Sequence, residues 1–393
     1  MMGSVRTWVL LLSGLFTGGA FAQTPTLYQQ RFEQGVQLMQ SNIDRAVAVF
    51  QALYAETGAT RVQLELARSL YIAEELDAAK TEFIDVLQKP IPITVRDKIE
   101  WYLSEIQKRQ SAKFYIGVFQ DSNPGQITAD RTFELFGQLF EYQPPTPTET
   151  QTAFSLAIEA ERELGHRSGY YAQASASTLT YETSAFNKQV IDVSLAKRWE
   201  DYNFKGARLG NQAMFYGGEF LYNMPYIAST VVLNRPNQDY YGLSGQVGQL
   251  DYPDYSYLNG TQVEGRVFYN HNLTDNLTTF FEVGADHTTA QEKAYGSTGF
   301  YGTVGTQIAH NPSSLQLDLK ATLSSRGYGG VDPLWGLTRQ DSGQIFYASL
   351  IKRDFYVFGL APVIEATYQT NHSNINFFSY DKFFVGLYFK TVY

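Results

Sequence analysis

From residue 113 onward, apolar and polar side chains alternate one by one along a series of long segments. The clearest is 315–323, in which four leucines and one alanine alternate with Gln, Asp, Lys and Thr. Segments 186–199 and 356–369 follow the same rule. Because neighbouring residues of a strand point to opposite faces, this pattern predicts strands with one apolar and one polar face. A soluble β-sandwich would show the same alternation, so further features must separate it from a membrane barrel.

Three features favour a closed outer-membrane barrel. The alternating segments are roughly 11–15 residues long, whereas strands of globular proteins average about 5–6. Aromatic residues stand at segment ends, as a bilayer-interface girdle requires. Connections alternate between tight turns, near 166–169, 201–202, 274–275, 311–312 and 353–354, and longer loops, at 122–150, 253–259, 289–296 and 326–341.

We predict about 14 antiparallel strands in residues 113–393. They begin near residues 113, 151, 169, 186, 203, 219, 240, 260, 276, 297, 313, 342, 355 and 378. A sheet in lipid must pair its backbone internally and therefore close, and at this strand count the lumen leaves room for a channel or a plug.

The last predicted strand, 378–393, ends in an aromatic residue. Phe389 and Tyr393 fall on its apolar face, and Gly386 lies inside it. Such a strand resembles the terminal signal read by the barrel assembly machinery, which pairs with the unpaired edge before closure. A simple core strand is the alternative.

The amino terminus has the pattern of a secretory signal peptide. Arg6 precedes an apolar run, and Ala20-Phe21-Ala22 supplies a small-x-small cleavage site. We therefore expect residues 1–22 to be removed and the mature chain to reach the periplasm or beyond. A buried core helix is the alternative reading.

Residues 23–112 have a different composition, with two of the 32 glycines, whereas residues 113–393 hold 26. Ala46-x-x-x-Phe50 recurs 33 residues later as Ala79-x-x-x-Phe83. This period is near the ~34 residues of tetratricopeptide repeats, in which the small residue lets helices approach and the ring fills the gap between them. We predict an α-helical, repeat-like docking or bracing domain over 23–112; a plain three- or four-helix bundle is the alternative.

The sequence shows no catalytic, cofactor or metal site. Cysteine is absent, and the formal net charge is −9, which argues against a nucleic-acid partner. The five histidines, His166, His271, His287, His310 and His372, have no metal-ligand spacing. Asp286 and His287 are adjacent strand residues that point to opposite faces, so they do not form a dyad. Charges predicted to face the lumen, namely Lys188, Asp192, Glu264, Arg266 and Lys320, are mixed in sign and are interpreted as solvating and bracing the interior.

A family resemblance follows from the order of these parts. The chain resembles the surface lipoprotein assembly modulators in four parts that follow in the same order. These parts are a signal peptide, a helical segment RVQLELARSLY at 61–71, a barrel opening GVFQDSN at 117–123, and a closing stretch with KRD at 352–354 and GLAP at 359–362. This family is also described as the translocators of a type XI secretion system. The resemblance covers most of 60–125 and 345–393.

The resemblance implies an outer-membrane translocator, not an enzyme, with its helical domain in the periplasm. Its implied partners are a cargo protein (a surface lipoprotein or a soluble haemophore-like protein), a periplasmic chaperone and the barrel assembly machinery, and we expect a monomer in outer-membrane lipid. A passive porin and a polysaccharide-export barrel are the alternative functions, and a barrel phospholipase is a weaker one. The candidate site is a set of polar residues expected to meet at the rim beside the seam between the first and last strands: Asp121, Ser122, Asn123, Ser373, Asn374 and Tyr380.

Overall fold

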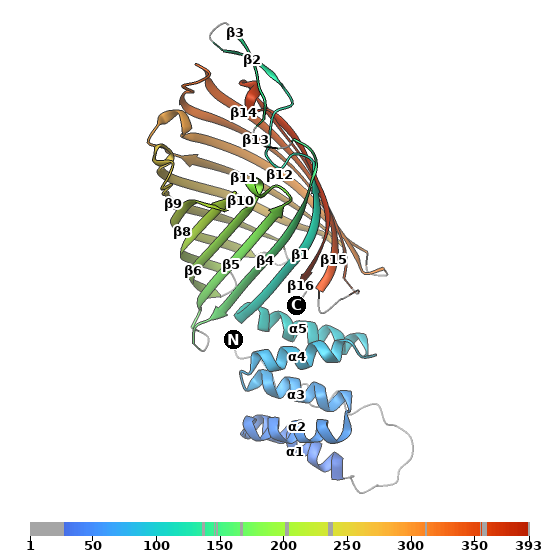
Figure 1. Cartoon of the computed structure of the whole chain (residues 1–393). Helices are drawn as coiled ribbons and strands as arrows, with labels where there is room; N and C mark the ends of the chain where they lie inside the picture. The colour runs from blue at the N-terminus through green and yellow to red at the C-terminus, as the bar shows by residue number, and fades with distance from the viewer. Residues whose placement is uncertain are drawn as a thin grey trace. The chain divides into compact units, whose positions relative to one another are not determined.

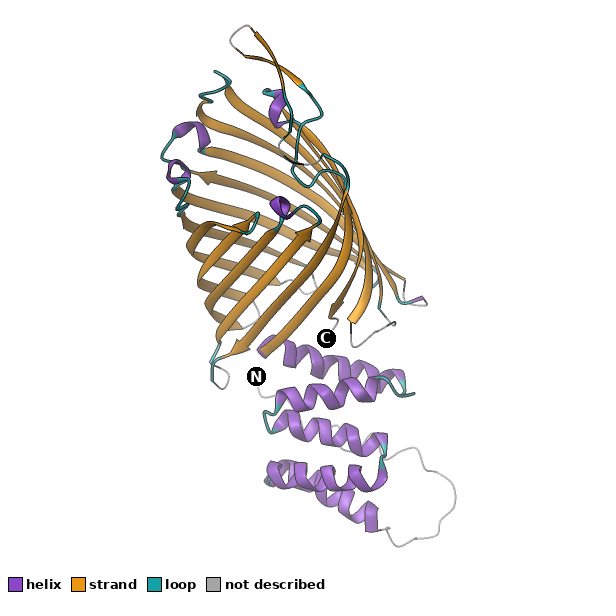
Figure 2. Cartoon of the chain, viewed as in Figure 1, coloured by secondary structure: helices purple, strands orange, loops and turns teal. Residues whose placement is uncertain are grey.

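The computed structural model describes residues 27–135, 138–144, 146, 148–165, 168–200, 204–234, 239–310, 313–353, 355 and 360–391. The predicted signal peptide, His166 and Tyr393 lie outside these residues. The chain divides into two compact units, Met1–Ile106 and Gln107–Tyr393. Five helices come first and a closed antiparallel barrel follows, which confirms the predicted fold class (Figures 1 and 2).

The helical part consists of α1 (Leu27–Ser41), α2 (Ile43–Thr57), α3 (Thr60–Ile72), α4 (Leu76–Leu87) and α5 (Ile93–Arg109). Asn42 caps α2 by accepting a hydrogen bond from the Arg45 backbone, and Gly58 ends it in the left-handed conformation, at φ 58°. None of the described helices is both long and apolar enough to cross a membrane.

The paired Ala and Phe positions lie in the core of this helical unit. Ala46, Phe50, Ala79 and Phe83 have no exposed surface. A Cβ at Gly35 of α1 would lie 2.7 Å from Cζ of Phe50, so the absence of a side chain there lets α1 approach α2 closely.

The barrel has fourteen strands within the described residues, each paired with its chain neighbours and closed by β1 against β16. The strands are β1 (Gln110–Asp121), β4 (Gln151–Glu163), β5 (Tyr170–Tyr181), β6 (Lys188–Glu200), β7 (Phe204–Tyr216), β8 (Glu219–Asn234), β9 (Tyr240–Leu250), β10 (Gly260–Thr274), β11 (Leu277–Thr288), β12 (Ser297–His310), β13 (Leu315–Val331), β14 (Thr338–Lys352), β15 (Leu360–Ser373) and β16 (Tyr380–Thr391). The predicted strand number is confirmed.

The two faces of the wall differ as the alternation predicts. Outward side chains such as Ile116, Val193 and Leu323 are more than half exposed and apolar, and together they form a belt around the barrel. Such a surface suits hydrocarbon and not water. Inward positions carry polar and charged residues, which makes the barrel an outer-membrane type and not a sandwich with an apolar core.

Two predicted loops are wrong in detail. The expected loop at 326–341 is reduced to 332–337, because β13 continues through its glycine-rich end to Val331 and β14 begins at Thr338. Backbone pairing beyond the apolar belt needs no apolar side chains, so hydrophobic alternation misses it. The expected loop at 122–150 contains a short hairpin, β2 (Thr132–Leu135) and β3 (Gln138–Glu141).

Candidate functional site: the seam and rim of the barrel

The seam between β1 and β16 is the shortest strand pairing in the described barrel. It runs over seven residue pairs, from Tyr115–Lys390 to Asp121–Phe384, whereas every other neighbouring pair of strands matches nine or more. Fewer ladder hydrogen bonds hold this seam, so its side chains contribute a larger share of its closure.

Aromatic rings cover two glycines across the seam. Phe119 lies opposite Gly386, and Tyr388 lies opposite Gly117. A Cβ at Gly386 would lie 2.3 Å from the Val118 carbonyl oxygen, and Phe119 stacks on Phe384 with 4.5 Å between ring centroids. Gly386 is therefore needed so that the ring can lie flat against the neighbouring backbone.

The fully buried carboxylate of Asp121 forms an ionic contact at the long-loop end of the seam. Its carboxylate accepts hydrogen bonds from the Tyr181 hydroxyl at 2.6 Å and from the Asn123 backbone N–H at 3.0 Å, and it pairs with Lys382 Nζ at 2.7 Å. Asp121 has no exposed surface, so this contact ties β1, β5 and β16 together away from solvent.

Ser122 and Asn123 extend the seam past the last ladder pair. The Ser122 backbone N–H donates to the Phe383 carbonyl, and the Phe383 N–H donates to Ser122 Oγ at 2.8 Å. Asn123 Nδ2 donates to the Ile127 carbonyl and to the Asp381 carbonyl, at 2.8 and 3.0 Å. These bonds fix the start of the long β1–β4 connection onto β16.

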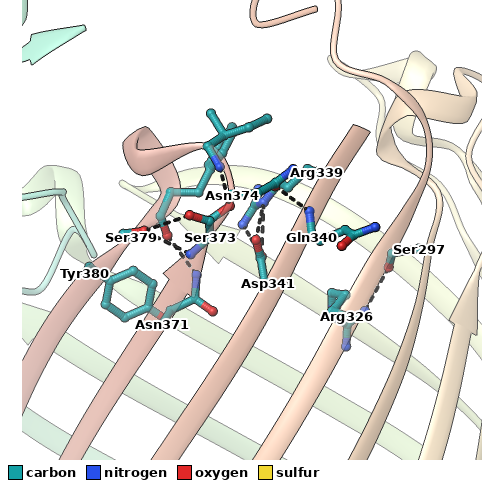
Figure 3. Close-up of polar contacts among 12 residues, drawn as sticks. Ser297, Arg326, Arg339, Gln340, Asp341, Asn371, Ser373, Asn374, Ser379 and Tyr380 are labelled. Carbon is teal, nitrogen blue, oxygen red and sulfur yellow. Dashed lines mark hydrogen bonds and ion pairs between the residues drawn. The ribbon is translucent and has the colours of Figure 1, made fainter. Parts of the chain in front are cut away.

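Ser373 and Asn374 act on other strands (Figure 3). Asn374 accepts from the Gln340 N–H at 2.7 Å and donates to the Thr338 carbonyl at 2.9 Å, so it holds the end of β15 against β14. The Ser373 N–H donates to Ser379 Oγ across the β15–β16 connection. The two polar clusters were expected to meet; in the described residues they share no hydrogen bond, because β16 separates them.

The remaining sequence-predicted residues lie on β16. The Tyr380 hydroxyl accepts from Gln369 Nε2 at 2.8 Å, facing inward. Phe389 is half-buried on the outward face, opposite Ile116.

Several residues of the seam and rim were not predicted from the sequence. Lys382 and Tyr181 complete the contact with Asp121. In the sequence, the strand alternation places both residues on the inward face, but it does not show that they meet Asp121. At the rim, Phe133 of the β2–β3 hairpin packs against Tyr142, Trp335 and Phe377, with ring centroids 5.4 to 6.0 Å away. The long connection that leaves β1 thereby reaches the β13–β14 and β15–β16 loops.

The lumen carries mixed charges, as predicted. Lys188, Asp192, Glu264, Arg266 and Lys320 all occupy inward register positions. Asp192 accepts from the Tyr226 hydroxyl, and Arg266 donates to Ser244 Oγ at 2.8 Å. Asp286 turns inward to Arg326 and His287 outward to Thr298, so the two side chains lie on opposite faces of the wall.

A polar network also lies in the helical unit. Gln63, almost fully buried, donates to Glu82 at 2.7 Å and to Asp85 at 2.6 Å and accepts from Lys89. The hydrogen bond from Gln63, together with that from Lys89, lowers the pKa of the Asp85 carboxyl below its ordinary value. The network therefore joins α3 to α4 through a charged group that is stabilised in its ionised form.

Comparison with solved structures finds distant outer-membrane proteins. They include the DcaP channel of Acinetobacter baumannii (8% identity, 72% of this chain and 96% of that one, TM-score 0.44) and a loop-deletion form of OmpT from Vibrio cholerae (8%, 72% and 99%, 0.38). A bacterial polysaccharide outer membrane secretin also matches (10%, 72% and 98%, 0.40). Likenesses this distant carry no argument about function. No curated protein sequence matches the chain.

The family model described as "Surface lipoprotein assembly modifier" matches residues 303–393. This stretch contains most of β12, all of β13 to β16, and with them the closing side of the seam and its Lys382. Over these residues the chain is similar to the surface lipoprotein assembly modifier family, the same family that its sequence motifs resemble.

Proposed function

We propose that this protein passes a partner protein, a surface lipoprotein or a soluble haemophore-like cargo, across the outer membrane. The observation that carries the proposal is the family match, which falls on the strands that close a wide, polar-lined barrel. A passive porin would explain the barrel but would give no role to the helices.

The chain direction supports an orientation for this role. With fourteen antiparallel strands, β1 begins and β16 ends at the same end of the barrel, and the longer loops lie at the opposite end. Outer-membrane barrels place short turns in the periplasm and long loops outside. We accordingly assign the helical region to the periplasm, where it recruits the cargo with its chaperone, and the Asp121–Asn123 rim to the cell surface.

The test removes residues 27–106 from the full chain and measures surface-exposed lipoproteins by biotinylation of intact cells. We expect one or more lipoproteins to lose surface labelling while their total amount stays unchanged. Heat-modifiable migration of the shortened protein shows whether its barrel has folded.

A second variant keeps the test decisive if the shortened chain fails to fold. This variant replaces four exposed apolar side chains on the surface of the helical unit and leaves its buried core residues unchanged. The substitutions are Ile72→Ala, Ile93→Ala, Trp101→Ala and Tyr28→Ala. Unchanged surface labelling in whichever of the two variants has a folded barrel would contradict the recruitment role.

A further inference from the structure

An apolar recess of about 630 Å³ lies on the outer, lipid-facing wall across β11 to β16. Its floor includes the small residues Thr306, Ala321, Ala348 and Ala366. The recess is thus a hollow in the apolar belt and not part of the lumen.

The strand register produces this hollow. Phe281, Val304, Ala321, Phe346, Tyr368 and Phe383 stand opposite one another in one row around the wall. The adjacent outward row runs through Thr306, Leu319, Ala348 and Ala366, and the row beyond it is large again, with Leu350 and Ile364. Ala321 in the first row and Thr306, Ala348 and Ala366 in the second are small, and they leave a hollow that is bordered by the rings of the first row, by Leu319 and by Leu350 and Ile364.

The chemistry of the recess selects its occupant. The backbone groups of these strands are paired within the wall, so a peptide segment would find no hydrogen-bond partners there. A hydrocarbon chain needs none. Five strand spacings of ~4.8 Å give a length of about 24 Å, enough for an acyl chain that fills one leaflet of about 15 Å.

One end of the recess becomes polar toward the rim. The Tyr368 hydroxyl donates to Asp381 Oδ1 at 3.3 Å, and the Asp381 carbonyl accepts from Asn123. An amphipathic molecule lying here would place its chain between the rings and its polar head beside the seam.

We infer that this recess holds an acyl chain of the lipoprotein cargo while the cargo's protein part crosses the membrane. The inference rests on the proposed function and names the lipid anchor as the group that the outer wall recognises. Ordinary phospholipid is the competing occupant, and the experiment separates the two.

The experiment uses the full-length protein in vesicles of phosphatidylethanolamine and phosphatidylglycerol. The probe is a synthetic diacylglyceryl-cysteine peptide with a photoreactive diazirine in one acyl chain. The test variant Ala348→Leu with Ala366→Leu fills the floor with side chains that lipid tolerates. Its matched control, Ala174→Leu with Ala176→Leu, makes the same change at outward, exposed positions of β5.

We expect photo-adducts concentrated on the recess, reduced about tenfold in the test variant and unchanged in the control, a loss equivalent to about 1.4 kcal/mol. Unlabelled lipopeptide should displace the probe, and phospholipid with the same chains should not. Adducts spread evenly around the belt, or equal displacement by phospholipid, would overturn the inference.

Surface labelling in cells separates this failure from failure of the proposed function. If cells with the filled recess display lipoproteins normally, while cells without the protein do not, only the acyl-chain site is refuted. If the surface labelling of lipoproteins is the same in cells with and without the protein, the proposed function itself is refuted.

Discussion

The Asp121–Lys382 contact makes a quantitative prediction about the seam. Replacing Asp121 by alanine removes the acceptor for three donors and leaves Lys382, whose side chain is 13% exposed, without its counter-charge. Breaking a buried ion pair from one side costs about 3–5 kcal/mol. We expect Asp121→Ala to lower the free energy of unfolding of the barrel by that amount.

A double-mutant cycle isolates the pair from other effects of the substitution. Lys382→Met alone leaves a buried carboxylate but keeps its bonds from Tyr181 and Asn123, so a smaller loss of about 2–3 kcal/mol is expected. The double variant Asp121→Ala with Lys382→Met removes both charges, so its loss should be about 2–3 kcal/mol less than the sum of the single losses.

The assay is urea unfolding of the protein refolded in phospholipid vesicles, followed by tryptophan fluorescence and by heat-modifiable migration. Asp121→Asn serves as a milder control, because it keeps an acceptor oxygen and loses only the charge. Additive losses in the cycle, or a loss below about 1 kcal/mol for Asp121→Ala, would show that the seam does not depend on this contact.

Three further perturbations test other parts of the molecule. Gly386→Ala forces a Cβ against the Val118 carbonyl and should cost about 1–3 kcal/mol in the same urea assay, while Gly302→Ala, with open space around it, should cost nothing. The pKa of Asp85 is lowered in the folded state, so its ionised carboxylate stabilises the helical unit above the ordinary pKa, and this stabilisation is lost as the pH falls through the lowered pKa. Amide hydrogen exchange of α3 and α4 in the full chain should therefore become faster in acid. The increase should be smaller in the variant Asp85→Asn. Asn123→Ala with Asn374→Ala should reduce cargo surface labelling more than heat-modifiable barrel formation; an equal loss of both would assign these residues to assembly alone.

Most of the barrel could be predicted because the bilayer imposes its own regularity on the sequence. Apolar residues at every second position, as in 315–323, are required wherever a strand faces lipid. Above the belt this requirement ends, so the glycine-rich end of β13 and the β2–β3 hairpin carried no hydrophobic signal.

The contacts at the seam were less predictable than the barrel, because they depend on the register in which β1 and β16 pair. Parity places Asp121 and Lys382 on the inward face, but their contact depends on how two strands about 260 residues apart are aligned. Asp121 pairs with Phe384, and a shift of two residues that placed Asp121 opposite Gly386 would keep every side chain on its face but separate the two charges. Periodicity cannot detect such a shift. The same limit led to the expectation that Asn123 and Asn374 meet.

The ion pairs of the lumen bear on the route that a cargo takes. Arg266–Glu282 joins adjacent strands, and Arg198–Glu161 and Arg326–Asp286 reach only to the next strand but one. Within the part of the barrel that the structure describes, the ion pairs follow the wall and none bridges opposite sides. Widening the lumen therefore breaks none of them, whereas separating β1 from β16 breaks the Asp121–Lys382 contact and the packing of Phe119 on Gly386. If cargo leaves through the seam, a disulfide engineered across β1 and β16 must stop export, and if it leaves along the lumen, the same disulfide must leave export intact.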